Sequence, residues 1–394
     1  MDPPAVAPLT ASAGAHPPAD TPLGRERPAA APESEHLLGL DAVRVVALLL
    51  IMVIHADHWP LQQSGADKSF WAGVDLVARV SVPVFVILSG LLLTYRRQDE
   101  MPLAVFVRRR LGRSLLPWIV WVPVYALIGI YFTQEVAPNA SGVVSWWLLG
   151  GGHLWYLLLV PQLYVLFQLW PRGPRATAAL AVVAIALQTG LDLYRLYASP
   201  DAPFNGAFLA YGYEFFFFWI GYFALGAAVG VRLAGHRPTW PSWPFWLAAI
   251  AGAALLLGRD FGGAVNAAFA EGTGAFLRPS LPILTVALFF AVAIVAEPIM
   301  RGHPRLSQAI GALSRYSLGI YIVHEVLTYV PGRLLAPSLL QRHLPLSIVG
   351  FATVVAATLG LAYLVTRLLV ASPLAIIVGL PRERFRRRGG PTPS

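Results

Sequence analysis

The chain has 394 residues, of which 57% are hydrophobic and only 12% are charged, and its mean hydropathy is +0.62. Because a soluble globular domain is typically about a quarter charged, this composition excludes an ordinary soluble protein and indicates an integral membrane protein. The net charge of +9 would suggest a nucleic-acid partner in a soluble protein, but here the basic residues fall between apolar segments, so we expect membrane lipids as partners and no nucleic acid.

The predicted elements, taken in chain order, form one helical membrane domain between two polar tails. Residues 1–36 are rich in proline and alanine, have little to bury, and are expected to be disordered. The apolar run that begins near Leu37 is long enough to cross a bilayer and lacks a clear small-residue cleavage site, so we expect it to remain as a signal anchor. The transmembrane domain is expected over residues 37–370, and residues 381–394 form a basic tail suited to anionic lipid.

The fold class expected from this pattern is an all-α bundle of about ten transmembrane helices. The apolar runs are continuous, as transmembrane helices require. Their expected limits are 37–56, 74–94, 114–133, 153–170, 176–191, 213–231, 244–258, 280–300, 316–333 and 346–369. Several runs are shorter than about 20 residues, so we expect some helices to extend into the loops.

The distribution of basic residues predicts how the chain is oriented in the membrane. With the N-terminus inside, the segments on the cytoplasmic side hold twenty arginines, whereas the outer loops hold six lysines or arginines. Cytoplasmic loops of membrane proteins carry such an excess of positive charge. We therefore expect both termini in the cytoplasm and a multi-pass protein of the cell membrane.

Two residues of the first span, Arg44 and His55, are unusual inside a membrane. They are eleven residues apart, which places them on one face of a helix and about 16 Å from each other along its axis. A charge at this depth is costly, so the default interpretation is a functional site. The alternatives are an arginine that pairs with a carboxylate in the bundle and a histidine at a solvated helix end. In the expected orientation Arg44 lies toward the inner leaflet and His55 at the outer interface.

Further polar residues gather in the outer half of the later spans. They are Asp75 and Arg79 in the second, His153, Trp155 and Tyr156 in the fourth and Glu214 in the sixth, while His324 and Glu325 lie near the middle of the ninth. Arginines crowd the inner surface instead. This arrangement suits a reaction that takes an anionic reagent from the cytoplasm and delivers it outward, although the aromatic residues also fit an interfacial belt.

Five segments carry recognisable patterns in a fixed order. They are the Arg44–His55 spacing preceded by Asp41, residues 84–93 with Ser89 and Gly90, residues 108–113 followed by Pro117, residues 153–157, and residues 317–324 with Tyr321 and His324. Together they resemble the acyltransferase 3 family of membrane acyltransferases over roughly residues 36–375. Two departures are mild, namely tyrosine at 156, where the family usually has phenylalanine, and leucine at 91 after the Ser-Gly pair.

The resemblance implies transfer of an acyl group, usually acetyl, from cytoplasmic acyl-CoA to a hydroxyl of an envelope carbohydrate, a lipid-linked glycan or a small molecule. Acyl-CoA would be the donor substrate, and no cofactor is expected to stay bound. A hydroxyl needs a general base near neutral pH, and we predict His55 for that role. Arginine matches phosphate with a planar fork, so Arg108, Arg109, Arg110 and Arg113, in an expected loop, are candidates to bind the nucleotide end. Such a loop is also ordinary for a cytoplasmic face.

The remaining candidates are expected to contact the substrates or to orient these groups. They are Asp41, Arg79, Ser89, His153, Trp155, Tyr156, Glu214, Tyr321 and His324. Arg44 would hold the pantetheine arm, a phosphate or a developing oxyanion, and His324 would act as a second proton carrier or orient the acceptor. Helix packing is the simpler interpretation for Ser89 and Tyr321. The histidines lack metal-ligand spacing and cysteine is absent, so no metal is expected.

Two other function classes stay open. A secondary transporter also has many spans with charged groups near the membrane midplane. Against it, no internal repeat relates the two halves, and the prolines at 83, 117, 123 and 161 have no counterparts at matching offsets in the second half. A non-catalytic membrane partner of a glycan-assembly system is the third class, and it predicts indifference to the loss of His55.

Overall fold

The computed structural model describes residues 37–62, 65–96, 102–133, 136–148, 151–171, 173–199, 201–234, 249–254, 258, 276 and 280–382. The chain divides into two units, Met1–Glu35 and His36–Ser394, and all described residues belong to the second. The predicted tail 1–36, most of the seventh predicted span and all but two residues of the basic tail 381–394 therefore lie outside the described residues.

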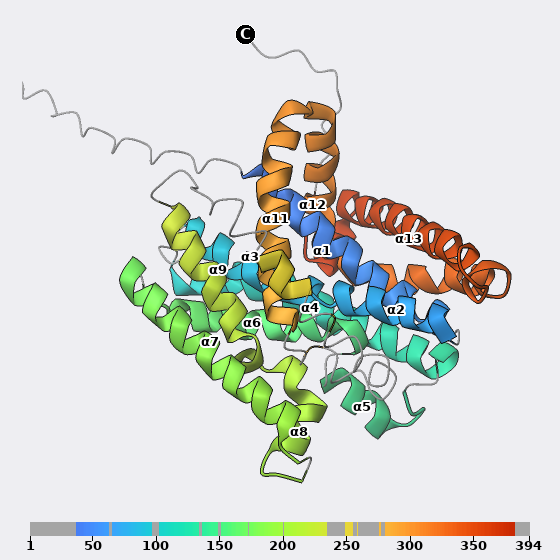
Figure 1. The fold of residues 1–394 in the computed structure, drawn as a ribbon, viewed down its shortest axis with the longest axis horizontal. Helices are drawn as coiled ribbons and strands as arrows, with labels where there is room; N and C mark the ends of the chain where they lie inside the picture. The colour runs from blue at the N-terminus through green and yellow to red at the C-terminus, as the bar shows by residue number, and fades with distance from the viewer. Residues whose placement is uncertain are drawn as a thin grey trace, which may run out of the picture. The chain divides into compact units, whose positions relative to one another are not determined.

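The described part of the chain is helical and contains no β-strand (Figure 1). Its α-helices are α1 (Leu38–Ala56), α2 (Gly65–Ala78), α3 (Ser81–Tyr95), α4 (Leu103–Ile128), α5 (Ala140–Leu148), α6 (Tyr156–Gln168), α7 (Pro174–Tyr197), α8 (Asn205–Tyr211), α9 (Ile220–Leu233), α11 (Ser280–Gly302), α12 (Pro304–Leu335) and α13 (Leu346–Ala371). Short 3₁₀ turns are η1 (Pro60–Gln62), η4 (Gly152–Trp155), η5 (Gly212–Glu214), η6 (Phe216–Phe218) and η9 (Pro373–Val378). Single π-helical turns, η3 (Gly129–Thr133) and η8 (Ala336–Leu340), follow α4 and α12.

Within the described residues, six helical stretches are long and apolar enough to cross a membrane, or seven if α5 and the bent η4–α6 segment form one span. The six are Leu38–Ala56, Asp67–Tyr95, Ala104–Tyr131, Pro174–Arg195, Ser280–Gly302 and Leu346–Ala371. The protein is therefore an all-helical, multi-pass membrane protein in its described part. The count of ten spans and the cytoplasmic position of both termini stay predictions.

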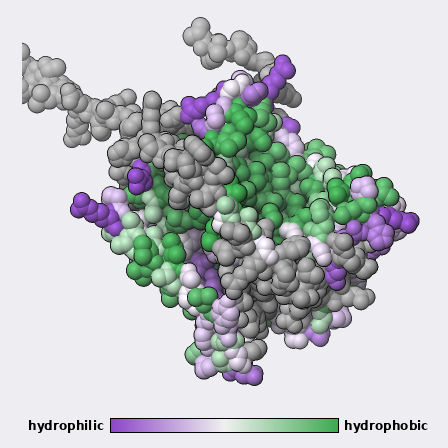
Figure 2. All heavy atoms as spheres, viewed as in Figure 1, coloured by the Kyte–Doolittle hydropathy of each residue, from purple (hydrophilic) through white to green (hydrophobic). Residues whose placement is uncertain are grey.

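Hydrophobic side chains are exposed where helices would face lipid. On α7 the exposed residues include Val182 and Val183, and on α13 they include Leu364 and Leu368. Figure 2 shows a hydrophobic surface over α11, α12 and α13, with hydrophilic residues gathered at the turn between α11 and α12. Apolar surface of this extent is unfavourable in water but fits the hydrocarbon of a bilayer.

The arginine-rich segment 108–113 is helical, so its prediction as a loop was wrong. Helix α4 begins at Leu103, eleven residues before the predicted third span. Pro102 immediately precedes the first turn, where a missing backbone N–H costs nothing, and leucine and arginine are good helix formers. The apolar pattern alone predicts only the later part of this helix, because the first turns contain the arginines and are not apolar.

Helices α1 and α12 form a parallel pair that positions the site. Arg44 of α1 contacts Ser314 of α12, and eleven residues further along both helices His55 lies beside Glu325. The equal spacing shows that the two helices run in the same direction and stay in register. The pair is fixed from the side by α11, because Gly39 leaves no room for a Cβ against the carbonyl oxygen of Ala293.

The hydrophobic core has two main clusters that meet beside this pair. One cluster packs α3, α6 and α9 around Leu88 and Phe223, and the other packs α1, α4, α12 and α13 around Leu48 and Ile320. Phe85 and Tyr156 pack against both clusters. The polar groups described next lie along this boundary.

Candidate functional site

Three histidines and one glutamate come together at one end of the α1–α12 pair. We call His55, His153, His324 and Glu325 the histidine cluster. The ring centroid of His55 lies 5.0 Å from that of His324 and 5.5 Å from that of His153, and the last two centroids are 5.0 Å apart. Glu325 Oε1 is 3.7 Å from His55 Nδ1, and Glu325 Oε2 contacts His153 Nδ1. One carboxylate therefore faces two imidazole rings.

Three separate segments build this cluster. His55 lies in the last turn of α1, and His324 and Glu325 are consecutive residues on α12. His153 arrives on the short turn η4, which follows Gly151 and Gly152 with φ angles of 61° and 62°. Glycine adopts this left-handed backbone without steric cost, and it lets the chain turn sharply into the bundle. His153 is consequently buried, and the side chain of His55 is 23% exposed.

Hydrogen bonds fix the proton positions on two of the rings. The carbonyl oxygen of Tyr321 lies 2.6 Å from His324 Nδ1 and 3.1 Å from His153 Nε2. A carbonyl only accepts, so each of these nitrogens carries a hydrogen. His324 Nε2 then keeps its lone pair, and it has no hydrogen-bond partner among the described residues. The other ring nitrogen of His153, Nδ1, faces Glu325 Oε2.

Two tyrosines enclose the cluster. The Tyr321 hydroxyl donates to the backbone carbonyl of His153, and the Tyr125 hydroxyl donates to the carbonyl of Ile322 at 2.8 Å. The ring of Tyr125 also lies edge-on to His153, at 4.7 Å between centroids. These bonds tie η4 and α4 to α12 and hold the imidazole rings in place.

Arg44 lies about 16 Å from His55 along α1, at the other end of the site. Its Nη1 donates to Ser314 Oγ at 2.8 Å, and Ser314 Oγ donates to Asp41 Oδ1 at 2.6 Å. Arg44 Nη1 is also 3.7 Å from Asp41 Oδ1. The pairing with a carboxylate, which the sequence left open as an alternative for Arg44, is thus present, and it orients the guanidinium group.

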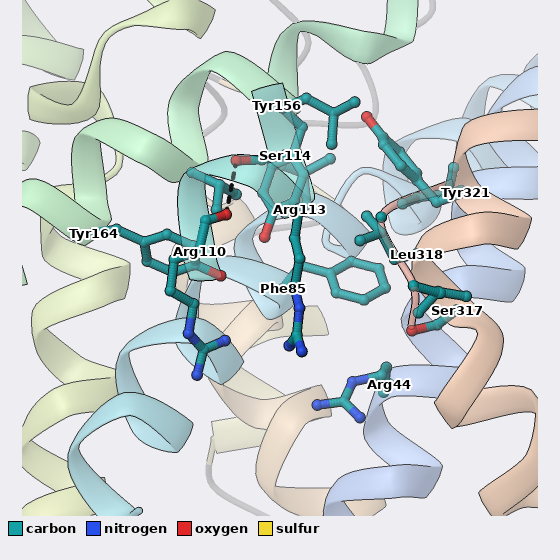
Figure 3. Close-up of a pocket in the computed structure, with 16 residues that line it drawn as sticks. Arg44, Phe85, Arg110, Arg113, Ser114, Tyr156, Tyr164, Ser317, Leu318 and Tyr321 are labelled. Atoms are coloured by element: carbon teal, nitrogen blue, oxygen red, sulfur yellow. Dashed lines mark hydrogen bonds between the residues drawn. The ribbon is translucent and has the colours of Figure 1, made fainter. Parts of the chain in front are cut away.

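A cavity of about 230 Å³ is lined by residues of α1, α3, α4, α6 and α12, Arg44 and Tyr321 among them (Figure 3). The guanidinium groups of Arg44, Arg110 and Arg113 lie at one end of it, and Tyr321 lies toward the other. We call this cavity the arginine pocket. The residues that line it are Arg44, Ile51, Val82, Phe85, Arg110, Arg113, Ser114, Tyr156, Leu157, Val160, Tyr164, Ser317, Leu318, Tyr321, Gly379 and Leu380. Its walls are mainly apolar, and Tyr321 connects it to the histidine cluster through the bond to His153.

The structure brings two of the four candidate phosphate-binding arginines to this pocket. Arg110 and Arg113 line it, since residues three apart share a face of α4. The Arg110 guanidinium also lies 5.5 Å from the ring centre of Tyr164. Arg108 is exposed and is not among the lining residues, and the side chain of Arg109 lies outside the described part of the chain.

Tyr156 contributes to the pocket wall, and Ser89 contacts its hydroxyl. Ser89 Oγ donates to the carbonyl of Phe85 at 2.9 Å and lies 3.4 Å from the Tyr156 hydroxyl. The ring centroids of Tyr156 and Tyr321 are 5.9 Å apart. Ser89 therefore orients a tyrosine that lines the cavity, in addition to closing a helix turn.

The other predicted residues lie around the cluster or away from it. Trp155 packs on Trp219, with ring centroids 5.2 Å apart, and Arg79 pairs with Asp75 at 2.8 Å. Glu214 lies in η5, and in the described part of the chain its backbone carbonyl accepts a hydrogen bond from Gln162 of α6. This hydrogen bond places Glu214 beside α6.

Sequence reasoning assigned no role to Glu325, Ser314 or Tyr125. A carboxylate in the middle of an apolar span was a usable signal for Glu325. Ser314 and Tyr125 gave no such signal, because serine and tyrosine are common in membrane helices and at their interfaces. Their roles follow only from the register of α12 against α1 and α4.

The geometry supports acid–base chemistry at one end and anion binding at the other. His55 is free of a short bond to Glu325, since 3.7 Å exceeds hydrogen-bond length, and so its ring can accept a proton. A proton on His55 would be stabilised by the nearby carboxylate. Among the described residues no three His, Cys, Asp or Glu side chains are arranged to hold a metal ion.

Comparison with known protein families gives a match over most of the chain. A family model for acyltransferase 3, described as an acyltransferase domain, matches residues 37–367. No curated protein and no solved structure matches the chain. The matched region contains the whole histidine cluster, Arg44 and most of the arginine pocket. The resemblance inferred from the five ordered motifs is thereby confirmed.

Proposed function

Because the chain belongs to the acyltransferase 3 family and is an O-acyltransferase-type enzyme, we propose that it transfers an acyl group, most simply acetyl, from cytoplasmic acyl-CoA to a hydroxyl of an envelope carbohydrate or lipid-linked glycan. The observation that carries this proposal is the arginine pocket, because Tyr321, which lines it, is hydrogen-bonded to the backbone of His153 in the histidine cluster. The pocket offers an anion-binding end and mainly apolar walls, and the base lies in the cluster beyond Tyr321.

The arginine end suits the phosphates of acyl-CoA. Arg44, Arg110 and Arg113 present three guanidinium groups, and arginine binds phosphate through two parallel hydrogen bonds. The mainly apolar walls suit the pantetheine arm, which is flexible and long enough to reach from Arg44 to His55. Since these residues are about 16 Å apart, we assign Arg44 to the donor rather than to an oxyanion at the reacting carbonyl.

The histidine cluster suits the transfer step. His55 takes the proton from the acceptor hydroxyl, the oxygen attacks the thioester carbonyl, a C–O bond forms and the C–S bond breaks. The sulfur leaves as a thiolate and takes up the proton, which yields the acyl ester and free CoA thiol. Glu325, held by His153, stabilises the positive charge on His55, and His324 Nε2 offers a second acceptor for the proton.

Comparison of cells with and without the gene tests the proposal. Mass spectrometry of their glycans and lipids is expected to show an acyl group, of acetyl mass, that is present only when the gene is present. The same product should form when purified protein in liposomes receives acetyl-CoA and the acceptor glycan. Movement of a solute without any acyl transfer would instead support the secondary-transporter alternative.

The donor assignment predicts the effect of removing two arginines. A double variant, Arg110→Ala with Arg113→Ala, is expected to raise KM for acetyl-CoA at least about 100-fold, because each charged hydrogen bond contributes about 1.5–3 kcal/mol and at least two are lost. Arg108→Ala is the matched control, since Arg108 is exposed outside the pocket on the same helix. Steady-state kinetics of the purified proteins measure KM for acetyl-CoA. Equal KM values for the double variant and the control would contradict the assignment of Arg110 and Arg113 to the donor.

The role of Glu325 predicts a loss of rate without a loss of fold. Glu325→Gln keeps the size of the side chain but removes its charge, so we expect kcat to fall about 10- to 100-fold because the protonated His55 loses its counter-ion. Glu297→Gln on α11 serves as control, because Glu297 contacts Gly39 and Arg301. An unchanged kcat in a folded Glu325→Gln protein would refute this role.

A further inference from the structure

The segment that follows α13 completes the arginine pocket. We call residues 372–380 the C-terminal wall, because its last two residues, Gly379 and Leu380, line the pocket together with residues of five helices. The match to the acyltransferase 3 family model ends at residue 367, before this segment begins. The C-terminal wall therefore adds to the pocket a part that lies outside the matched domain.

The sequence of the C-terminal wall explains how the chain turns into the pocket. The 3₁₀ turn η9 (Pro373–Val378) ends at Gly379, whose φ angle of 68° is left-handed. The N–H of Gly379 donates to the carbonyl of Ile376 at 3.1 Å, and the N–H of Leu380 donates to that of Ala375 at 3.3 Å. This pair of bonds is the Schellman motif, in which a glycine reverses the chain and the next residue makes an apolar contact. Leu380 is that next residue.

The C-terminal wall is fastened to α4, the helix of the pocket arginines. Trp121 Nε1 donates to the carbonyl of Ile377 at 2.9 Å, and Val378 is fully buried. Gly379 lies so close to the carbonyl oxygen of Arg113 that a Cβ would not fit between them. The backbone of the C-terminal wall thus packs on the turn of α4 that carries Arg113.

Leu380 also packs on α12, at a level between the two ends of the site. A Cβ on Gly319 would lie 3.3 Å from Leu380 Cδ1, so the leucine contacts the α12 backbone there. Gly319 is about 7.5 Å along α12 from Ser314, the partner of Arg44, and about 9 Å from Glu325 of the histidine cluster. A donor that reaches from the arginines to the cluster has to pass this level.

We propose that Leu380 is a specificity-determining residue that contacts the pantetheine arm of acyl-CoA, and that Gly379 positions Arg113 for the phosphates of the nucleotide end. This inference rests on the proposed function. The apolar side chain of Leu380 suits the carbon chain of the arm, and the close approach at Gly379 sets where α4 presents its arginine. The C-terminal wall thereby favours a donor that carries such an arm.

Substitution of Leu380 tests the contact with the arm. Leu380→Ala is expected to raise KM for acetyl-CoA about 3- to 10-fold, because part of the apolar surface that covers the arm is lost, and to leave kcat within about twofold. The inhibition constant of adenosine 3′,5′-bisphosphate, which is the nucleotide end of CoA without the arm, should not change. Leu374→Ala is the matched control, since Leu374 is exposed on the same segment and is not among the lining residues.

Substitution of Gly379 should have a different signature. Gly379→Ala places a Cβ against the carbonyl of Arg113 in a left-handed backbone, so Arg113 has to shift. We expect both KM for acetyl-CoA and the inhibition constant of adenosine 3′,5′-bisphosphate to rise about 3- to 10-fold. Circular dichroism establishes whether this variant is folded. Leu380→Ala leaves the backbone of the turn unchanged and tests the proposal even if Gly379→Ala does not fold.

The two constants separate the possible results. If KM for acetyl-CoA is the same in Leu380→Ala and Leu374→Ala, Leu380 does not contact the donor and the inference is wrong. It is also wrong if Leu380→Ala weakens adenosine 3′,5′-bisphosphate as much as acetyl-CoA, because the effect then does not involve the arm. Absence of acetyl transfer by the wild-type protein would instead refute the proposed function, and the inference with it.

Discussion

Replacement of His55 with alanine is expected to lower kcat for acyl transfer by about 10²–10⁴-fold, the usual contribution of a general base. Within the part of the chain that the structure describes, His55 has the imidazole ring of the cluster that makes no short bond to a carbonyl or carboxylate, so it is able to take the acceptor proton. The donor end of the site lies elsewhere, and KM for acetyl-CoA should therefore change little. Steady-state kinetics of purified His55→Ala measure both constants.

The chain offers a close control for this experiment. His58 lies three residues further on, is exposed, and stacks edge-on against Trp59 rather than against the histidine cluster. His58→Ala removes the same side chain one turn away, so it should keep the wild-type kcat. Circular dichroism and size-exclusion chromatography establish that both proteins are folded. A folded His55→Ala protein with the kcat of His58→Ala would remove His55 from the mechanism.

Replacement of Arg44 is expected to act on the donor instead. Arg44→Ala should lower kcat/KM for acetyl-CoA about 100-fold, mainly through KM, because it removes charge-assisted hydrogen bonds at the end of the arginine pocket. Arg44→Lys keeps the charge but loses the fork, so we expect an intermediate value. Lysine cannot hold Ser314 and a phosphate in the same planar geometry.

The link from Arg44 to Asp41 through Ser314 supplies the control. Ser314→Ala removes the hydroxyl that connects Arg44 to Asp41 but leaves the guanidinium charge in the pocket. Its KM should rise less than that of Arg44→Ala. If Arg44→Ala lowers the thermal midpoint of unfolding and leaves KM for acetyl-CoA unchanged, then Arg44 only holds α1 against α12. That result would contradict a role of Arg44 in binding the donor.

Continuous apolar runs made three of the helices predictable almost to the residue. The predicted spans 37–56, 280–300 and 346–369 correspond to α1 (Leu38–Ala56), α11 (Ser280–Gly302) and α13 (Leu346–Ala371). The run 316–333 marked only the second half of α12, because the helix begins at Pro304 in a polar stretch that hydropathy does not report. The arginine-rich segment 108–113 was predicted as a loop for the same reason. Hydropathy does not distinguish charged residues in a helix from charged residues in a loop, although arginine has a good helix propensity.

The separate halves of the site could be read from the sequence, but their connection could not. Helical periodicity placed Arg44 and His55 on one face, and the structure shows both of them against α12. The approach of His153 depends on the left-handed turn at Gly151 and Gly152, which brings η4 between α1 and α12. No spacing rule links residues so far apart in the chain, so the pairing of His153 with Glu325 needed the structure.

The central claim is that the histidine cluster transfers an acyl group from a donor seated in the arginine pocket. Its most direct test is the transfer of labelled acetyl from acetyl-CoA to envelope glycan by purified protein in liposomes, with wild type and folded His55→Ala side by side. We predict label on the glycan with the wild type and almost none with the variant. Equal labelling by both proteins, or no labelling by the wild type with any acceptor from its own envelope, would contradict the claim.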